Sequence, residues 1–132
     1  MNRTVAVPGD RRGNSKMNLT LLKAKLHRIR VTEACLDYEG SLSLDPDDME
    51  AVGILPFEKI LCADVENGNR FETYAIEGKR GSHVCCLNGA AAHMGKVGER
   101  LIVMAFGQFT PEEAVTHQPK VVFLGDGNKP HA

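Results

Sequence analysis

Apolar and polar residues alternate along much of this chain, which is the pattern of half-buried β-strands. In residues 22–31 the apolar positions carry even numbers up to Leu26 and odd numbers from Ile29. Because side chains of a strand alternate between two faces, a change of parity within one strand indicates a β-bulge. We therefore expect one long strand here, with a bulge near His27 and Arg28.

Six shorter strand-like runs follow, separated by turn residues. The Asn67-Gly68 pair between the second and third runs is a strong hairpin signal, because both residues tolerate positive φ. The fifth run is apolar at almost every position, so we expect it to be a buried strand. The runs span residues 41–44, 59–65, 70–76, 84–87, 100–106 and 120–124.

Two brief helices are predicted between these runs. Asp45 is placed to cap the first helix, Pro46 suits its first turn, and Gly53 closes it. The second helix begins with a capping box from Thr110 to Glu113. Many short strands with tight turns and two brief helices predict a mainly β protein built as a small barrel.

The two ends of the chain differ from the middle. Residues 1–16 hold four basic residues and one acidic residue, a net of +3 in a chain of net charge -1. They show no periodicity and no apolar run long enough for a signal peptide, so we expect a disordered extension before a single domain of residues 17–132. Residues 125–132 are expected to form a loose tail.

Composition excludes several functions. The chain has 132 residues, of which 42% are hydrophobic, and this length fits one domain with a real core. The net charge of -1 argues against a nucleic-acid partner. No apolar run has the length of a transmembrane helix, so no membrane partner is expected.

The four cysteines have no zinc-ligand spacing, so no metal site is predicted from them. Buried, reduced thiols in a cytoplasmic protein are the favoured interpretation. The cysteines are Cys35, Cys62, Cys85 and Cys86.

Taken singly, the polar residues beside the strands all have structural explanations. Gly40-Ser41 is a turn by itself, and Thr73 and Tyr74 are common strand residues. No nucleotide-binding or metalloprotease motif occurs, and no G-x-S-x-G is present. A serine hydrolase remains open on these grounds, because serines and histidines are present without any pattern that pairs them.

Four motifs in order are far more specific than any one of them. "KLHR", "YEGS", "NGNRFETYAI" and "NGAAAH" each place polar residues beside strand-like runs. In combination they closely resemble the aspartate 1-decarboxylase family, whose members are pyruvoyl-dependent and process themselves. The resemblance extends from Met17 to about residue 128. It implies a double-psi β-barrel and a homotetramer whose active sites lie between subunits.

The resemblance implies that a precursor, or zymogen, cuts its own backbone between Gly40 and Ser41. The Ser41 hydroxyl would attack the Gly40 carbonyl to form an ester, aided by Thr73, and glycine leaves that attack unhindered. Elimination and loss of ammonia would convert Ser41 into the pyruvoyl group, a covalent cofactor. The products would be a β chain of residues 17–40 and an α chain of residues 41–132.

The implied reaction is α-decarboxylation of L-aspartate to β-alanine and CO2, which supplies pantothenate biosynthesis. The substrate amine would form a Schiff base with the pyruvoyl group, which accepts the electrons released with CO2. Tyr74 would then protonate the former α-carbon, since a phenol stays protonated at neutral pH. No metal takes part.

The family likeness also implies a polar substrate pocket. Arg70 would bind a carboxylate with two hydrogen bonds, and Tyr38 would support the site from just before the cut. Some family members carry a bulky aromatic residue where this chain has Ala63, so one wall is expected to be wider here. The substrate-binding residues are expected to be Lys25, His27, Arg70, Asn88, Gly89, Ala90 and Ala91.

Two alternatives predict a chain that is never cut. One is a small β-barrel binding or assembly protein, and the other is the serine hydrolase. An uncut chain would also arise if the precursor awaits a maturation factor, so the sequence leaves both spontaneous and assisted cleavage open.

Overall fold

The computed structural model describes residues 17–131, and the predicted extension of residues 1–16 lies outside this range. Its strands are β1 (Leu19–Arg30), β2 (Glu33–Cys35), β3 (Ser41–Leu44), β4 (Lys59–Asp64), β5 (Arg70–Glu77), β6 (Cys85–Asn88), β7 (Arg100–Phe109) and β8 (Lys120–Phe123). The α-helices are α1 (Pro46–Val52) and α2 (Pro111–Thr116), and the 3-10 helices are η2 (Gly89–His93) and η3 (Asp126–Asn128). The mainly β prediction with short helices is therefore confirmed.

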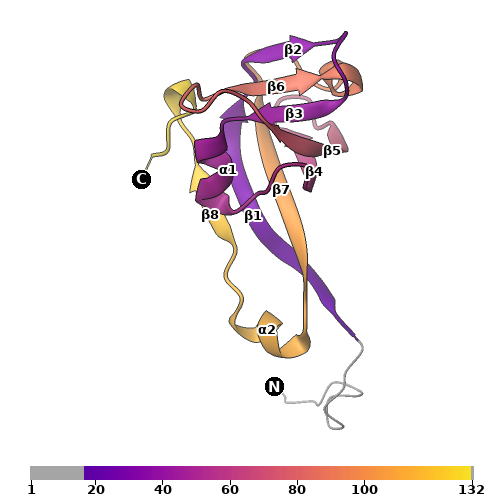
Figure 1. Cartoon of the computed structure of the whole chain (residues 1–132), viewed down its shortest axis with the longest axis vertical. Helices are drawn as coiled ribbons and strands as arrows, with labels where there is room; N and C mark the ends of the chain where they lie inside the picture. Colours follow the sequence, from indigo (N-terminus) through magenta and orange to yellow (C-terminus); the bar gives the residue numbers. More distant parts are fainter. Residues whose placement is uncertain (1–16, 132) are drawn as a thin grey trace.

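All eight strands belong to one mixed sheet with the order β2-β6-β3-β5-β4-β7-β1-β8. Figure 1 shows β1 and β7 as two long strands that run together from the upper part of the molecule toward α2. Within residues 17–131 no strand pairing joins β2 to β8, so the sheet has two edges. The closed double-psi barrel stays a prediction.

The bulge expected in β1 is present. The pairing of β1 with β7 shifts register between His27 and Ile29, and Arg28 takes a φ of 69°. A second shift follows Leu22, which the sequence pattern did not indicate. On either side of Leu26, which is fully buried, Lys25 and His27 project to the face away from the core.

The hydrophobic core lies on one face of the central strands. Leu42 and Leu44 of β3 have no exposed surface, and Leu87 of β6 packs in the same cluster. The predicted buried strand β7 is fully buried at the alternate residues Leu101, Val103 and Ala105, and half-buried at the residues between them. The physical reason is that one face of β7 covers the core while the other remains open.

Both predicted helix starts are confirmed. The Asp45 side chain accepts the N–H of Asp47, and Gly53 ends α1 with a φ of 79°. The capping box of Thr110 and Glu113 is present in α2. The predicted hairpin is also present, since β4 and β5 pair antiparallel across the Asn67-Gly68 turn.

The C-terminal segment is not a loose tail over its described residues. Asn128 is 2% exposed, and its Oδ1 accepts the Arg30 N–H at 2.7 Å. Its Nδ2 donates to the carbonyl oxygens of Arg30 at 2.9 Å and of His83 at 3.0 Å. The segment is ordered because one buried amide joins it to β1 and to the turn before β6.

Three of the four cysteines are buried, as expected. Cys62, Cys85 and Cys86 lie in the interior, whereas Cys35 is exposed at the sheet edge, so the expectation of burial is wrong there. Cys35 lies on the short edge strand β2, which no further strand covers. Between residues 17 and 131 no helix has the length and apolar composition needed to cross a membrane.

Replacing Asn128 should destabilise the fold. In Asn128→Ala the backbone groups of Arg30 and His83 lose their partners, and a non-glycine residue without a polar side chain must keep a φ of 57°. We expect a loss of about 3 kcal/mol in the free energy of unfolding, measured by urea denaturation. Asn128→Gly separates the two causes, because it removes the hydrogen bonds but relieves the backbone strain. An unchanged midpoint in both variants would contradict the role of this amide.

Candidate active site

Ser41 is the first residue of β3 and lies between β5 and β6. It is 1% exposed and pairs directly with Asn88 of β6. Leu42 pairs with Ala75 in the parallel direction, so continuing this register by one residue brings Tyr74 level with Ser41. Three segments far apart in the sequence therefore meet at Ser41.

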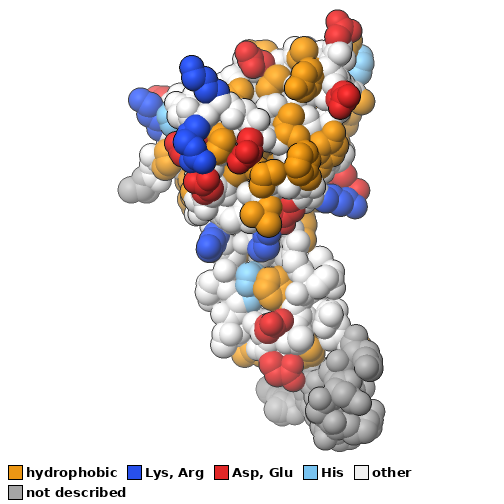
Figure 2. All heavy atoms as spheres, viewed as in Figure 1, with side chains coloured by type: hydrophobic (Ala, Val, Ile, Leu, Met, Phe, Trp, Pro, Cys, Tyr) orange, Lys and Arg blue, Asp and Glu red, His pale blue; other side chains and the backbone are white. Residues whose placement is uncertain are grey.

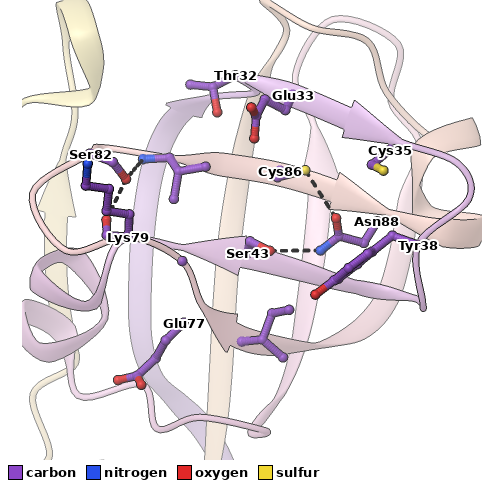
Figure 3. Close-up of a pocket in the computed structure, with 13 residues that line it drawn as sticks. Thr32, Glu33, Cys35, Tyr38, Ser43, Glu77, Lys79, Ser82, Cys86 and Asn88 are labelled. Atoms are coloured by element: carbon purple, nitrogen blue, oxygen red, sulfur yellow. Dashed lines mark hydrogen bonds between the residues drawn. The ribbon is translucent and has the colours of Figure 1, made fainter.

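The Ser41 hydroxyl is held by the side chain of Asn88. Asn88 Nδ2 donates to Ser41 Oγ at 2.9 Å and to Ser43 Oγ at 2.9 Å, and Asn88 is itself 2% exposed. Cys86 Sγ donates to Asn88 Oδ1 at 3.1 Å. Figure 3 shows Asn88 between Ser43 and Cys86 on adjacent strands. Both ends of the amide are engaged, which fixes its orientation.

The backbone of η2 touches the residues just before Ser41. A Cβ at Gly89 would lie 2.6 Å from the Tyr38 carbonyl oxygen and 2.8 Å from the Gly40 nitrogen. Gly89 also has a φ of 63°, a region that favours glycine. Of the two alanines that follow, Ala90 is exposed and Ala91 is buried. Only glycine allows this turn to lie against Gly40.

Strand β5 contributes three of the predicted residues. Arg70 and Tyr74 are four apart and share one face, whereas Thr73 points to the other face but lies level with Gly40 by the same register. Tyr74 is 37% exposed, so its phenol is accessible. Ala63 of β4 pairs with Arg70. The small residue that stands where some family members have an aromatic one therefore lies beside Arg70.

Lys25 and His27 form a separate group. They lie on β1, which is separated from β5 by β4 and β7 in the sheet. Neither residue lines the cavity of about 570 Å³ that contains Asn88, the partner of Ser41. His27 instead lines a cavity of about 410 Å³ whose other residues are Arg28, Arg30, Arg100, Phe123, Leu124, Gly125, Asp126 and His131.

The surroundings of His27 favour the neutral form of its imidazole. Burial lowers the pKa of its imidazole, and the positive charges of Lys25 and Arg28 lower it further. Its ring lies edge-on to Phe123 with 5.0 Å between ring centroids. The Nδ1 atom is buried and has no hydrogen-bond partner among the described residues.

A cavity of about 570 Å³ opens beside Ser41, on the side of the sheet away from Leu42 and Leu44. Of the predicted residues, Tyr38 and Asn88 line it (Figure 3). Its other walls are formed by Thr32, Glu33, Cys35, Ser43, Ile76, Glu77, Gly78, Lys79, Ser82, Val84 and Cys86. The sequence interpretation missed Ser43 and Cys86, although period-two spacing from Ser41 and from Asn88 places each on the same face.

A second cluster of ionisable groups lies between α1 and the turn before β6. Asp45, Asp48 and His83 each offer a ligand atom within 4.8 Å of the others, although the sequence spacing predicted no metal ligands. The Asp45 carboxylate already accepts N–H groups from Asp47, Gly81 and His83. Burial, together with the negative charge of Asp45, raises the pKa of Asp48 to about 6. None of the three lines the cavity beside Ser41.

The buried Asp48 should make stability fall as the pH rises. Its folded-state pKa of about 6 exceeds the ordinary value of 3.8, so its favourable contribution is complete below pH 3.8 and is lost as the pH passes 6. At pH 8 we expect the free energy of unfolding of Asp48→Asn to be about 2 kcal/mol higher than that of the wild type. At pH 4 we expect little difference. Urea denaturation across this range measures the effect. The control is Glu112→Gln, which removes an exposed carboxylate of α2 outside this cluster, and an Asp48→Asn effect independent of pH would contradict the role of Asp48.

Comparison with known proteins identifies the family of this chain. The sequence profile of the aspartate decarboxylase family matches residues 17–131. The aspartate 1-decarboxylase of Ruminiclostridium cellulolyticum is 50% identical over 86% of this chain and 88% of its own length. Those of Caldicellulosiruptor saccharolyticus and Acetivibrio thermocellus are 52% and 53% identical over 86% of this chain, covering 88% and 90% of their own lengths. The chain therefore belongs to the aspartate decarboxylase family.

Proposed function

We propose that this protein decarboxylates L-aspartate to β-alanine and CO2, as the names of its relatives indicate, and so supplies pantothenate biosynthesis in the cytoplasm. The observation that carries the proposal is the environment of one peptide bond. Ser41 is buried with its hydroxyl bound to Asn88, and the glycine turn of η2 lies against Gly40. Together these features support a chemical role for the bond between Gly40 and Ser41.

The same contacts support self-cleavage at this bond. Ser41 Oγ accepts a hydrogen bond from Asn88, so its position is fixed while a lone pair remains for attack on the Gly40 carbonyl. Ser41 is 1% exposed, so its hydroxyl is shielded from water, whereas Gly40 on the other side of the bond is exposed. In this proposal Thr73, level with Gly40 by register although on the other face of β5 from Tyr74, stabilises the oxyanion that develops.

The residues around Ser41 fit a pyruvoyl group in its place. The missing Cβ of Gly89 lets η2 lie directly against Gly40, and Asn88 Nδ2 can donate to a keto oxygen where the hydroxyl now lies. When formed, this group supplies the electron sink for loss of the α-carboxylate. Tyr74 lies level with Ser41 and holds a phenolic proton for delivery to carbon.

Substrate binding divides between two parts of the chain. Arg70 shares the face of Tyr74 and offers a bidentate partner for a carboxylate. Lys25 and His27 lie on β1, outside the cavity beside Ser41, which supports an assembly in which they serve the site of a second copy. Asn88, Gly89, Ala90 and Ala91 complete the proposed binding wall.

A homotetramer fits the surface of this chain. Exposed apolar side chains of the described residues include Leu36, Leu55 and Phe57, the last 76% exposed. Figure 2 shows apolar side chains gathered on one face of the upper part of the molecule. Such a patch is typical of an interface. The proposed protomer is a single domain of residues 17–132, cut into residues 17–40 and 41–132.

Intact mass and aspartate turnover test this function. We expect two fragments separated after Gly40, with the 41–132 piece lighter by one ammonia than the same peptide beginning with serine. Ser41→Ala should remain uncut and inactive, because it lacks the attacking oxygen, and β-alanine formation should rise in proportion to the cut fraction. A wild-type chain that stays uncut even with cell extract would overturn self-processing. A cut chain without activity on aspartate would overturn the substrate.

Gly89 should be essential for the cut. In Gly89→Ala the new Cβ must displace Tyr38 or Gly40, so we expect the cleavage rate to fall at least about 100-fold, as for misplaced reacting groups. The matched control is Gly98→Ala, where φ is also positive at 93° but no atom lies within 4 Å of the new Cβ. It should lose stability and still be cut. Equal cleavage in both variants would show that contact with Gly40 is unimportant.

A further inference from the structure

Four polar side chains of β3 and β6 form one hydrogen-bonded group. Ser41 pairs with Asn88 and Ser43 pairs with Cys86 in the antiparallel register, so the four lie at the corners of a square. The leucines between them, Leu42 and Leu87, turn to the core. Asn88 uses both amide hydrogens on the two serines and its oxygen on the Cys86 thiol.

Cys86 decides which way the Asn88 amide points. Burial raises the pKa of this thiol, and the charge of Glu33 on β2 raises it further, so the sulfur keeps its proton. A protonated thiol donates, and the acceptor at 3.1 Å is Asn88 Oδ1. Glu33 lies opposite Cys86 and is a competing acceptor for the same proton.

The orientation matters for the Ser41 hydroxyl. With Nδ2 toward the serines, Ser41 Oγ accepts a hydrogen bond and its own proton is left for transfer. If the Asn88 amide were rotated by 180°, the Ser41 hydroxyl would donate a hydrogen bond to Oδ1. An amide oxygen is too weak a base to take this proton away. During cleavage the bond from Ser41 Oγ to the Gly40 carbonyl carbon forms and the Gly40–Ser41 C–N bond breaks. The hydroxyl proton ends on the released amine, so a free hydroxyl proton favours the step.

We propose that Cys86, with Ser43, is a positioning residue for self-cleavage, which orients the Asn88 amide so that it donates to Ser41. This inference rests on the proposed self-processing and adds two residues that the sequence motifs did not single out. Both residues line the cavity beside Ser41, and the hydrogen bonds that connect them to Ser41 run through Asn88. Their effect reaches Ser41 only through Asn88.

The test compares Cys86→Ala with Cys86→Ser in uncut precursor, followed by intact mass over time. Cys86→Ala removes the donor, and we expect cleavage to slow about tenfold, the effect of one lost hydrogen bond. Cys86→Ser keeps a donor and should stay within about twofold of the wild type. Ser43→Ala removes one of the two acceptors of Asn88 Nδ2 and should slow cleavage about threefold. This variant tests the proposal if Cys86→Ala does not fold.

Cys62→Ala is the packing control. Cys62 is a fully buried thiol on β4 that does not line the cavity beside Ser41. We expect the Tm of Cys62→Ala to fall at least as much as that of Cys86→Ala, whereas its cleavage rate should equal that of the wild type. Cleavage of Cys86→Ala at the wild-type rate, or equal slowing in Cys86→Ala and Cys86→Ser, would overturn the positioning role while leaving the proposed function intact. A wild-type chain that is never cut would instead overturn the function on which the inference rests.

Discussion

The burial of Leu42 and Leu44 is the constraint on which the site depends. Both side chains are fully enclosed in the core, so β3 cannot slip by one residue without exposing them. The alternation of a strand then places Ser41 and Ser43 on the opposite face, toward the cavity. The hydrophobic core therefore determines the direction of the Ser41 hydroxyl.

Close backbone approach adds the second requirement. Gly89 brings η2 against Gly40, while Asn88, the preceding residue, holds Ser41 from β6. Consecutive residues thus contact both sides of the same peptide bond. A rigid arrangement of this kind suits a reaction that must begin in the folded precursor, because the reacting groups are already in place.

The segments around this centre are joined by buried polar side chains as well as by apolar packing. Asn128 joins the C-terminal segment to β1, and Asp45 joins α1 to the turn before β6. Each satisfies backbone groups that strands leave unpaired at irregular points. His83 takes part in both connections, through its carbonyl to Asn128 and through its N–H to Asp45. The turn before β6 is thereby held from two sides, which steadies the strand that carries Cys86 and Asn88.

Sequence alone determined the mainly β class, both helix caps, the hairpin at Asn67-Gly68 and the bulge after His27, because these depend on neighbours within a few residues. Its four motifs also indicated the family and the residues around Gly40-Ser41. It could not show that Cys86 and Ser43 meet at Asn88, that Asn128 anchors the tail, or that Lys25 and His27 lie apart from Ser41. Those outcomes depend on which strands become neighbours, and strand order is decided by the packing of the whole sheet rather than by local pattern.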